Sequence, residues 1–342
     1  MKSNFAEKTL WFSEQSKKFL RNSGAERHAS NGYDDYAAYV HTLIPIILKS
    51  GKVPADTTIE DLHTEFLMCY VMNFWRKNKA IYDFSESFLN ELAKTEDAPM
   101  YTEVLSRLPF PCFAMNLPSD TEYDGMVVNL EYDSDMPDSD WLLEFFLFQW
   151  KSDHESNIMQ STIQCKNGEN LLQAHRNITE CSAKAKMVLG YEDYANNTLV
   201  AGKKMESYIR IAVSAAYYLA SRNAEVREVN LPKDLRPVIV SKQNGKIKQK
   251  KVNTRTFEVG YVIGKNFEKQ MTAKTNDCQR LLATEPTGRT VRPHVRRAHW
   301  HHYWVGEGRT RLEVRWIEPT FVMPNEKSEP DTAVVRKVYG VV

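Results

Sequence analysis

Apolar residues recur at helical spacing through most of the first hundred positions. Further helical patterns cover residues 33–48, 62–75 and 85–92, and residues 57–60 (Thr-Thr-Ile-Glu) have the form of an N-terminal cap before the second of them. The earliest stripe consists of Phe5, Leu10, Trp11, Phe12, Phe19 and Leu20. This spacing predicts a helical N-terminal half whose aromatic side chains pack in a core.

The pattern changes after a group of prolines at positions 109, 111 and 118. Residues 126–132 and 141–150 have the composition of strands, and the acidic residues 133–140 between them predict a turn in an antiparallel pair. Helical spacing returns at residues 168–189 and 205–220, and residues 223–236 have the character of a connector. Residues 257–263 predict a further strand.

Strict alternation governs residues 299–317, as in a two-stranded hairpin. His299, His301, Tyr303 and Val305 would face one side of the first strand, and Trp300, His302 and Trp304 the other. Residues 306–309 (Gly-Glu-Gly-Arg) predict the turn. On the return strand, Leu312, Val314 and Trp316 alternate with Arg311, Glu313 and Arg315. We expect the tryptophans to form the inner face, and Pro319 and Pro324 to end regular pairing.

These patterns together predict an α+β fold. It has a helical N-terminal half, antiparallel strands in the middle and a C-terminal β-hairpin module. The expected regions are a helical part at residues 1–108, an α+β part at 109–222, and a basic connector with a β-rich module at 223–342.

Composition narrows the cellular setting. The 342 residues are 42% apolar and 26% charged with a net charge of +1, so a nucleic-acid surface would have to arise from local clustering. We expect no membrane partner, because no stretch of 18 apolar residues occurs and the N-terminus lacks a signal-peptide core. The five cysteines form no C-x-x-C pair, which favours reduced thiols and a cytoplasmic protein.

One such cluster is a basic run without any intervening acid. It comprises Lys242, Lys246, Lys248, Lys250, Lys251 and Arg255. A run of this kind is usually a solvated loop, and the alternative is an electrostatic contact surface for RNA or the ribosome.

The densest chemistry lies near the C-terminus, where four of the nine histidines fall within residues 294–302. Seven arginines and no lysine occur between Arg289 and Arg315, which favours planar contacts with phosphate, carboxylate or unstacked bases. The candidate binding residues are Arg292, His294, Arg296, Arg297, His299, His301, Tyr303 and Arg315.

Three interpretations of this cluster remain open. His299 and His301, with His294, could bind zinc. His299, His301 and Arg297 could instead cleave RNA by acid–base chemistry without a metal. In the third interpretation these side chains only stabilise the fold or a bound peptide or RNA. Common nucleotide-binding, hydrolase and zinc-protease signatures are missing from the sequence, so we expect no cofactor, no stoichiometric metal and, on balance, no enzyme.

The order of residues in this segment also resembles a known family. Residues 292–304 (RPHVRRAHWHHYW) precede Gly306, Gly308, residues 312–317 (LEVRWI) and residues 320–322 (TFV). This string resembles the C-terminal signature of a type V-A anti-CRISPR family. The matching positions are Arg292, Pro293, His294, Arg296, Arg297, His299, Trp300, His301, Tyr303, Trp304, Gly306, Arg315 and Trp316.

The resemblance implies that the protein represses production of a target nuclease. Members of that family are understood to recognise the N-terminal peptide of a type V-A CRISPR nuclease during translation and to trigger degradation of its mRNA. The implied partners are that peptide, the ribosome, the mRNA and a host RNase. Two alternatives stay open: an RNase of another mobile-element system that acts through the His/Arg face, and a translational repressor that binds RNA or the ribosome.

Overall fold

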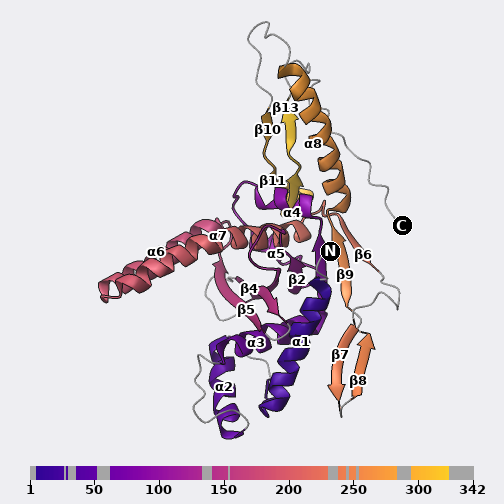
Figure 1. Ribbon diagram of the computed structural model, residues 1–342. Coiled ribbons are helices and arrows are strands. Elements are labelled where there is room, and N and C mark those ends of the chain that lie inside the picture. The colour runs from indigo at the N-terminus through magenta and orange to yellow at the C-terminus, as the bar shows by residue number, and fades with distance from the viewer. Residues whose placement is uncertain are drawn as a thin grey trace.

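A computed structural model describes residues 5–26, 28–29, 36–51, 62–132, 141–152, 155–229, 238–243, 246–251, 254–282 and 294–322. These residues form an α+β fold around one seven-stranded sheet (Figure 1), which confirms the predicted fold class. No helix in these ranges combines the length and the apolar character needed to cross a membrane.

The sheet has the strand order β5-β4-β3-β2-β1-β9-β6. Its strands are β1 (Ala80–Phe84), β2 (Cys112–Asn116), β3 (Gly125–Tyr132), β4 (Trp141–Ser152), β5 (Glu155–Cys165), β6 (Val226–Val229) and β9 (Arg255–Val259). Strand β1 runs parallel to its neighbours β2 and β9, and the other neighbouring strands are antiparallel. The predicted antiparallel pairing of residues 126–132 with 141–150 is therefore confirmed, whereas residues 133–140 lie outside the described residues.

Helices from the N-terminal half cover one face of the sheet. They are α1 (Phe5–Asn22), α2 (Tyr36–Lys49) and α3 (His63–Asn78), close to the predicted ranges. Phe12, Phe66 and Trp75 of these helices share a core with Ile81 and Phe146 of the strands. The predicted cap at residues 57–60 lies outside the described residues.

A second core lies on the opposite face. It is covered by α4 (Glu86–Ala93), α5 (Thr102–Leu105) and the apolar half of α7 (Glu192–Ala220), which pairs with α6 (Leu171–Val188). Tyr82 faces this core while its neighbour Ile81 faces the other, as the alternation of a strand requires. The predicted helices at 168–189 and 205–220 are confirmed, and α7 begins earlier than predicted.

The strand predicted at residues 257–263 is too long at its C-terminal end. It stops at Val259, and the helix α8 (Tyr261–Leu282) begins after Gly260, whose φ of +67° turns the chain. The carboxylate of Glu225 accepts hydrogen bonds from the backbone N–H groups of Val262 (2.8 Å) and Ile263 (3.0 Å). A distant acid thus satisfies the first turn of a helix that local pattern did not predict.

The basic run is also more ordered than the loop we predicted. Residues Val238–Gln243 and Lys246–Lys251 form the antiparallel pair β7–β8. The β-branched residues Val238, Ile239 and Val240 favour the extended chain. The predicted connector at 223–236 likewise contains the strand β6.

The C-terminal segment forms a long antiparallel ribbon. Its strands are β10 (His294–Arg296), β11 (His299–Val305), β12 (Arg311–Ile317) and β13 (Thr320–Val322), with a short turn η1 (Glu307–Arg309) between β11 and β12. The β10–β13 pair continues the register of β11–β12 without a shift. The prediction that Pro319 ends pairing is therefore wrong. Pro319 lacks an N–H group and only interrupts the ladder, which resumes at Thr320.

Candidate functional site

The predicted hairpin of residues 299–317 is confirmed, and two of its tryptophans anchor it to the helices. Trp300 and Trp316 lie opposite each other and are 9% and 2% exposed. The Trp316 ring contacts Phe88 edge-on at 5.1 Å between ring centroids, and Trp300 contacts Tyr217 in the same way at 5.1 Å. This face of the hairpin is part of the second core.

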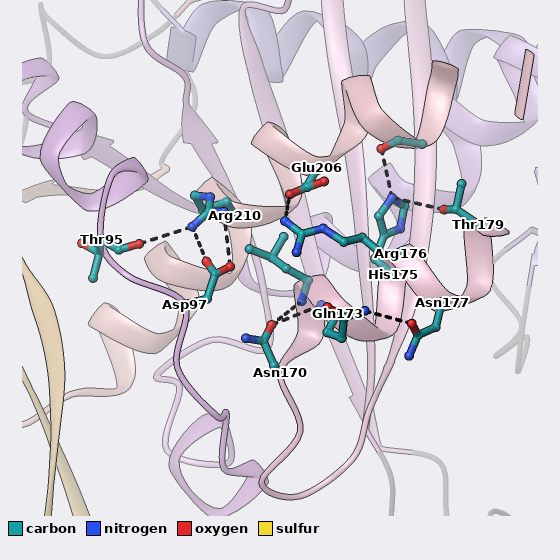
Figure 2. A network of polar contacts seen from close by, with 12 residues as sticks. Thr95, Asp97, Asn170, Gln173, His175, Arg176, Asn177, Thr179, Glu206 and Arg210 are labelled. Atoms are coloured by element: carbon teal, nitrogen blue, oxygen red, sulfur yellow. Dashed lines mark hydrogen bonds and ion pairs between the residues drawn. The ribbon is translucent and has the colours of Figure 1, made fainter. Parts of the chain in front are cut away.

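A polar network fixes the loop on which Trp316 rests. Trp316 Nε1 donates a hydrogen bond to Thr95 Oγ1 at 2.9 Å. Arg210 of α7 bonds the Thr95 carbonyl oxygen and forms an ion pair with Asp97 (Figure 2). Since all four groups are tied together, the position of β12 depends on α7.

The same view shows how α7 is joined to α6. Arg176 of α6 is turned towards Glu206 of α7 and forms an ion pair with it, and His175 Nε2 lies 3.1 Å from the carbonyl oxygen of Gly202 (Figure 2). The Asn170 side chain caps α6 by accepting two backbone N–H groups. Side-chain contacts therefore hold α6 to α7, the helix against which the hairpin packs.

His302 faces inwards, as its position in the alternation predicts. Its Nε2 lies 3.0 Å from the Tyr217 hydroxyl, and its ring meets Tyr101 edge-on at 5.1 Å. Burial lowers the pKa of His302, with a further contribution from neighbouring His301. A lowered pKa favours the uncharged ring, and the contacts of this ring with Tyr217 and Tyr101 attach β11 to the helices.

Four of the predicted binding residues gather on the outer face of the hairpin. His299, His301, Tyr303 and Arg315 are all exposed. The ring centroids of His301 and Tyr303 are 4.2 Å apart, and the Arg315 guanidinium carbon lies 5.3 Å from the Tyr303 ring centroid. We call these four residues the outer row; it offers rings for stacking and cations for anionic groups.

The remaining predicted site residues are less closely grouped. Arg296 and Arg297 are exposed, and the Arg297 carbonyl oxygen lies 3.5 Å from His299 Nδ1. Arg292 and the side chain of His294 lie outside what the structure describes. Among the residues it does describe, no three His, Cys, Asp or Glu side chains are grouped as metal ligands would be.

Two predictions about the hairpin faces are wrong. Trp304 is 54% exposed instead of buried, although Leu312, its partner on β12, is only 1% exposed; at this level the second core therefore covers β12 and leaves the Trp304 ring of β11 open. Glu313 is only 6% exposed instead of lying on the open face.

Glu313 is buried because two arginines hold it. Its carboxylate accepts hydrogen bonds from Arg222 (2.6 Å) and Arg311 (2.8 Å). The bond from Arg222 holds the pKa of Glu313 below its ordinary value, against the opposing effect of burial. Arg222 follows the end of α7, so this pair of bonds is a second link between the hairpin and that helix.

The outer edge of β12 is covered by residues that the sequence did not point to. Arg107 donates to the Leu312 carbonyl oxygen at 2.6 Å, and the Arg222 backbone N–H donates to that of Val314 at 3.2 Å. The Asn223 side chain bonds both the N–H and the carbonyl oxygen of Trp316. Only the folded chain brings these distant positions to β12, and no local signal marks them.

A cavity of about 340 Å³ lies at the same place. It is lined by Arg107, Ala220, Arg222, Arg311, Glu313 and Val314. Two of the arginines that line it, Arg222 and Arg311, are already hydrogen-bonded to Glu313. These side chains serve to attach β12 to α7.

The basic run is separate from the outer row in the sequence, and one of its members is committed to the fold. The Arg255 guanidinium carbon lies 4.7 Å from the Phe110 ring centroid and 5.7 Å from that of Phe257, and its Nε lies 3.3 Å from Glu228. The lysines of β7–β8 lie on strands whose side chains are outside the described set.

A sequence model of the anti-CRISPR type V subtype A2 family (AcrVA2-like) matches residues 82–324, which run from the middle of β1 to the end of the ribbon. The chain belongs to this family. It is therefore a type V-A anti-CRISPR protein, as the resemblance of residues 292–322 predicted.

A solved structure described as the crystal structure of AcrVA2 is similar over 91% of this chain and 97% of that chain, with a TM-score of 0.46 and 16% sequence identity. No curated protein matches.

Proposed function

We propose that this anti-CRISPR protein recognises the N-terminal peptide of a type V-A CRISPR nuclease as it emerges during translation and triggers degradation of its mRNA. The supporting observation is the outer row. The His, Tyr and Arg residues of the family-like string stand exposed on a rigidly seated hairpin, where a partner can reach them. Side chains that served packing alone would be buried.

In this proposal the protein selects the transcript and a recruited host RNase cuts it. A direct nuclease needs two titratable groups within reach of one scissile phosphate. Of the clustered histidines, His302 is turned inwards to Tyr217, and the His301 ring lies in tilted contact with the Tyr303 ring. These contacts favour a role in binding over one in cleavage.

The proposal is tested with a reporter transcript that begins with the nuclease's N-terminal codons. We expect the protein to lower the level of this transcript in a translating lysate, and synonymous recoding of the leader should leave the effect intact. The matched control carries a pair of compensating frameshifts around the leader, which change the peptide but hardly change the RNA. Equal loss of the control transcript would overturn peptide recognition in favour of RNA recognition.

A further inference from the structure

The backbone of β11 presents an open edge, and the register of the hairpin identifies the residues on it. Residues in an antiparallel pair alternate between pairs that exchange hydrogen bonds and pairs that do not. Trp316 turns both its N–H and its carbonyl oxygen to Asn223, so its pair with Trp300 is of the second kind. The backbone groups of Trp300, His302 and Trp304 therefore point away from β12.

The two edges of the hairpin differ in what covers them. Arg107, Arg222 and Asn223 occupy the outer edge of β12, as described above. On β11, the Glu96 N–H bonds the Ala298 carbonyl oxygen at 3.3 Å. Beyond that point, from Trp300 to Trp304, no backbone hydrogen bond to another described residue continues along this edge, and β11 pairs with β12 alone within the described chain.

The chemistry of an open edge specifies its occupant. Three N–H groups and three carbonyl groups at strand spacing are complementary to an extended polypeptide. Natural edges are commonly guarded by lysine, proline or a bulge, and β11 has none of these. It instead carries the exposed rings of Trp304 and Tyr303, one on each face of the strand. Alternate side chains of an added strand could contact these two rings.

We propose that the N-terminal peptide of the target nuclease docks as a third strand along β11, from Trp300 to Trp304. This inference rests on the proposed function and adds the mode of binding. Alternate peptide side chains then lie beside His301 and Tyr303 of the outer row. The others lie on the side of Trp304, so sequence is read by every second residue while the backbone bonds hold the register.

A pair of variants at one position tests the edge. Trp304→Ala and Trp304→Pro both remove the exposed ring, but only the proline removes the outward N–H group. The pairing with β12 is retained in both, because that N–H does not face β12. We expect Trp304→Pro to bind a synthetic copy of the nuclease's N-terminal peptide roughly five- to tenfold more weakly than Trp304→Ala, the loss of about one backbone hydrogen bond.

A peptide series gives an independent readout that does not depend on how the variants fold. Each residue of the synthetic peptide is replaced in turn by its N-methyl form, and binding to the unaltered protein is measured by calorimetry. Strand addition predicts that methylation weakens binding at every second position. A loss at all positions, or no periodic loss together with equal affinity of the two variants, would overturn the edge and leave peptide recognition standing.

Two other outcomes count against the inference. If the unaltered protein does not bind the peptide more tightly than a scrambled copy, the proposed function fails and strand addition fails with it. If the protein sediments as a dimer that Trp304→Pro dissociates, a second copy of the chain occupies the edge in place of the peptide.

Discussion

At the residue scale, a few side chains of β12 carry the attachment of the ribbon to the body. Trp316 combines near-complete burial with a hydrogen bond to Thr95, and Glu313 combines burial with bonds from Arg222 and Arg311. Buried polar groups are costly unless they are paired, so both sites tolerate little change.

The first prediction compares two tryptophans of the hairpin. Trp316→Ala should lower the free energy of unfolding by roughly 3 to 5 kcal/mol, because it leaves a large cavity and removes the hydrogen bond that the Thr95 hydroxyl accepts. Trp304→Ala should change it little, since its ring is 54% exposed. Urea unfolding followed by circular dichroism measures both, and similar losses would mean that Trp304 is packed after all.

The second prediction concerns pH. The folded pKa of Glu313 is below the ordinary value of 4.5, so its ionised form adds stability that is fully present above that pH. This stability is lost as the pH falls from about 4.5 through the folded pKa. Glu313→Gln should therefore be less stable than the unaltered protein at pH 7, and the gap should close in acid.

The control for this pH series is Glu307→Gln, which changes an exposed carboxylate of the same hairpin. Thermal unfolding is recorded for the three proteins between pH 3 and pH 7. If the difference in stability between Glu313→Gln and the unaltered protein does not depend on pH, the charge of Glu313 does not contribute to its interaction with Arg222 and Arg311.

At the element scale, the junction of β9 and α8 shows how one residue redirects the chain. Gly260 has a φ of +67°, and a Cβ atom built there would overlap the Phe88 ring. The third prediction is that Gly260→Ala destabilises the fold by more than the roughly 1 to 3 kcal/mol typical of backbone strain alone. Gly190→Ala, at a φ of +80° with nothing within 4 Å, isolates the strain, and equal losses would exclude the contact with Phe88.

Elements with a strong local period could be predicted from the sequence. The helices α1 to α4, α6 and α7, the pair β3–β4 and the β11–β12 hairpin follow from spacing and turn residues. The parallel strands β1 and β9 could not be paired in this way, because their partners lie far away in sequence. The start of α8 was missed for the same reason, since its N–H groups bond Glu225 and not a local cap.

In the candidate site, too, features set by the local pattern could be predicted and features set by distant contacts could not. Alternation placed His299, His301, Tyr303 and Arg315 on one exposed face of the hairpin. It could not reveal how far the helical body extends beneath the strands, and this extent decides that Trp304 is exposed.

At the scale of the whole molecule, one sheet joins the parts of the chain. Its strands come from residues 80–84, 112–165 and 226–259; helices α1 to α3 cover one face, and the β11–β12 hairpin packs with α4, α5 and α7 on the other. Figure 1 shows α6 and α7 projecting from this body as a pair. Folding and function should therefore be separable, because the exposed row on the ribbon is outside both cores.

The fourth prediction tests that separation. Replacing Arg297 and His299 together by Gln should leave the melting temperature nearly unchanged and abolish the loss of the target mRNA. A control that replaces the exposed Lys166 and Lys184 by Gln should retain repression. A double variant that melts early would make the cluster structural. One that folds and still represses would move the working surface elsewhere, for example to the basic run of β7–β8.

The unbroken register of the ribbon has a consequence for how such a protein can change over generations. Residues His294–Arg296 and His299–Val305 each have a fixed partner between Arg311 and Val322, and a shift of one position would move every side chain to the opposite face. A single inserted or deleted residue in either strand would bury the outer row and expose the tryptophans. We expect inherited length differences to be confined to the turn between Gly306 and Thr310, where the strands impose no such count.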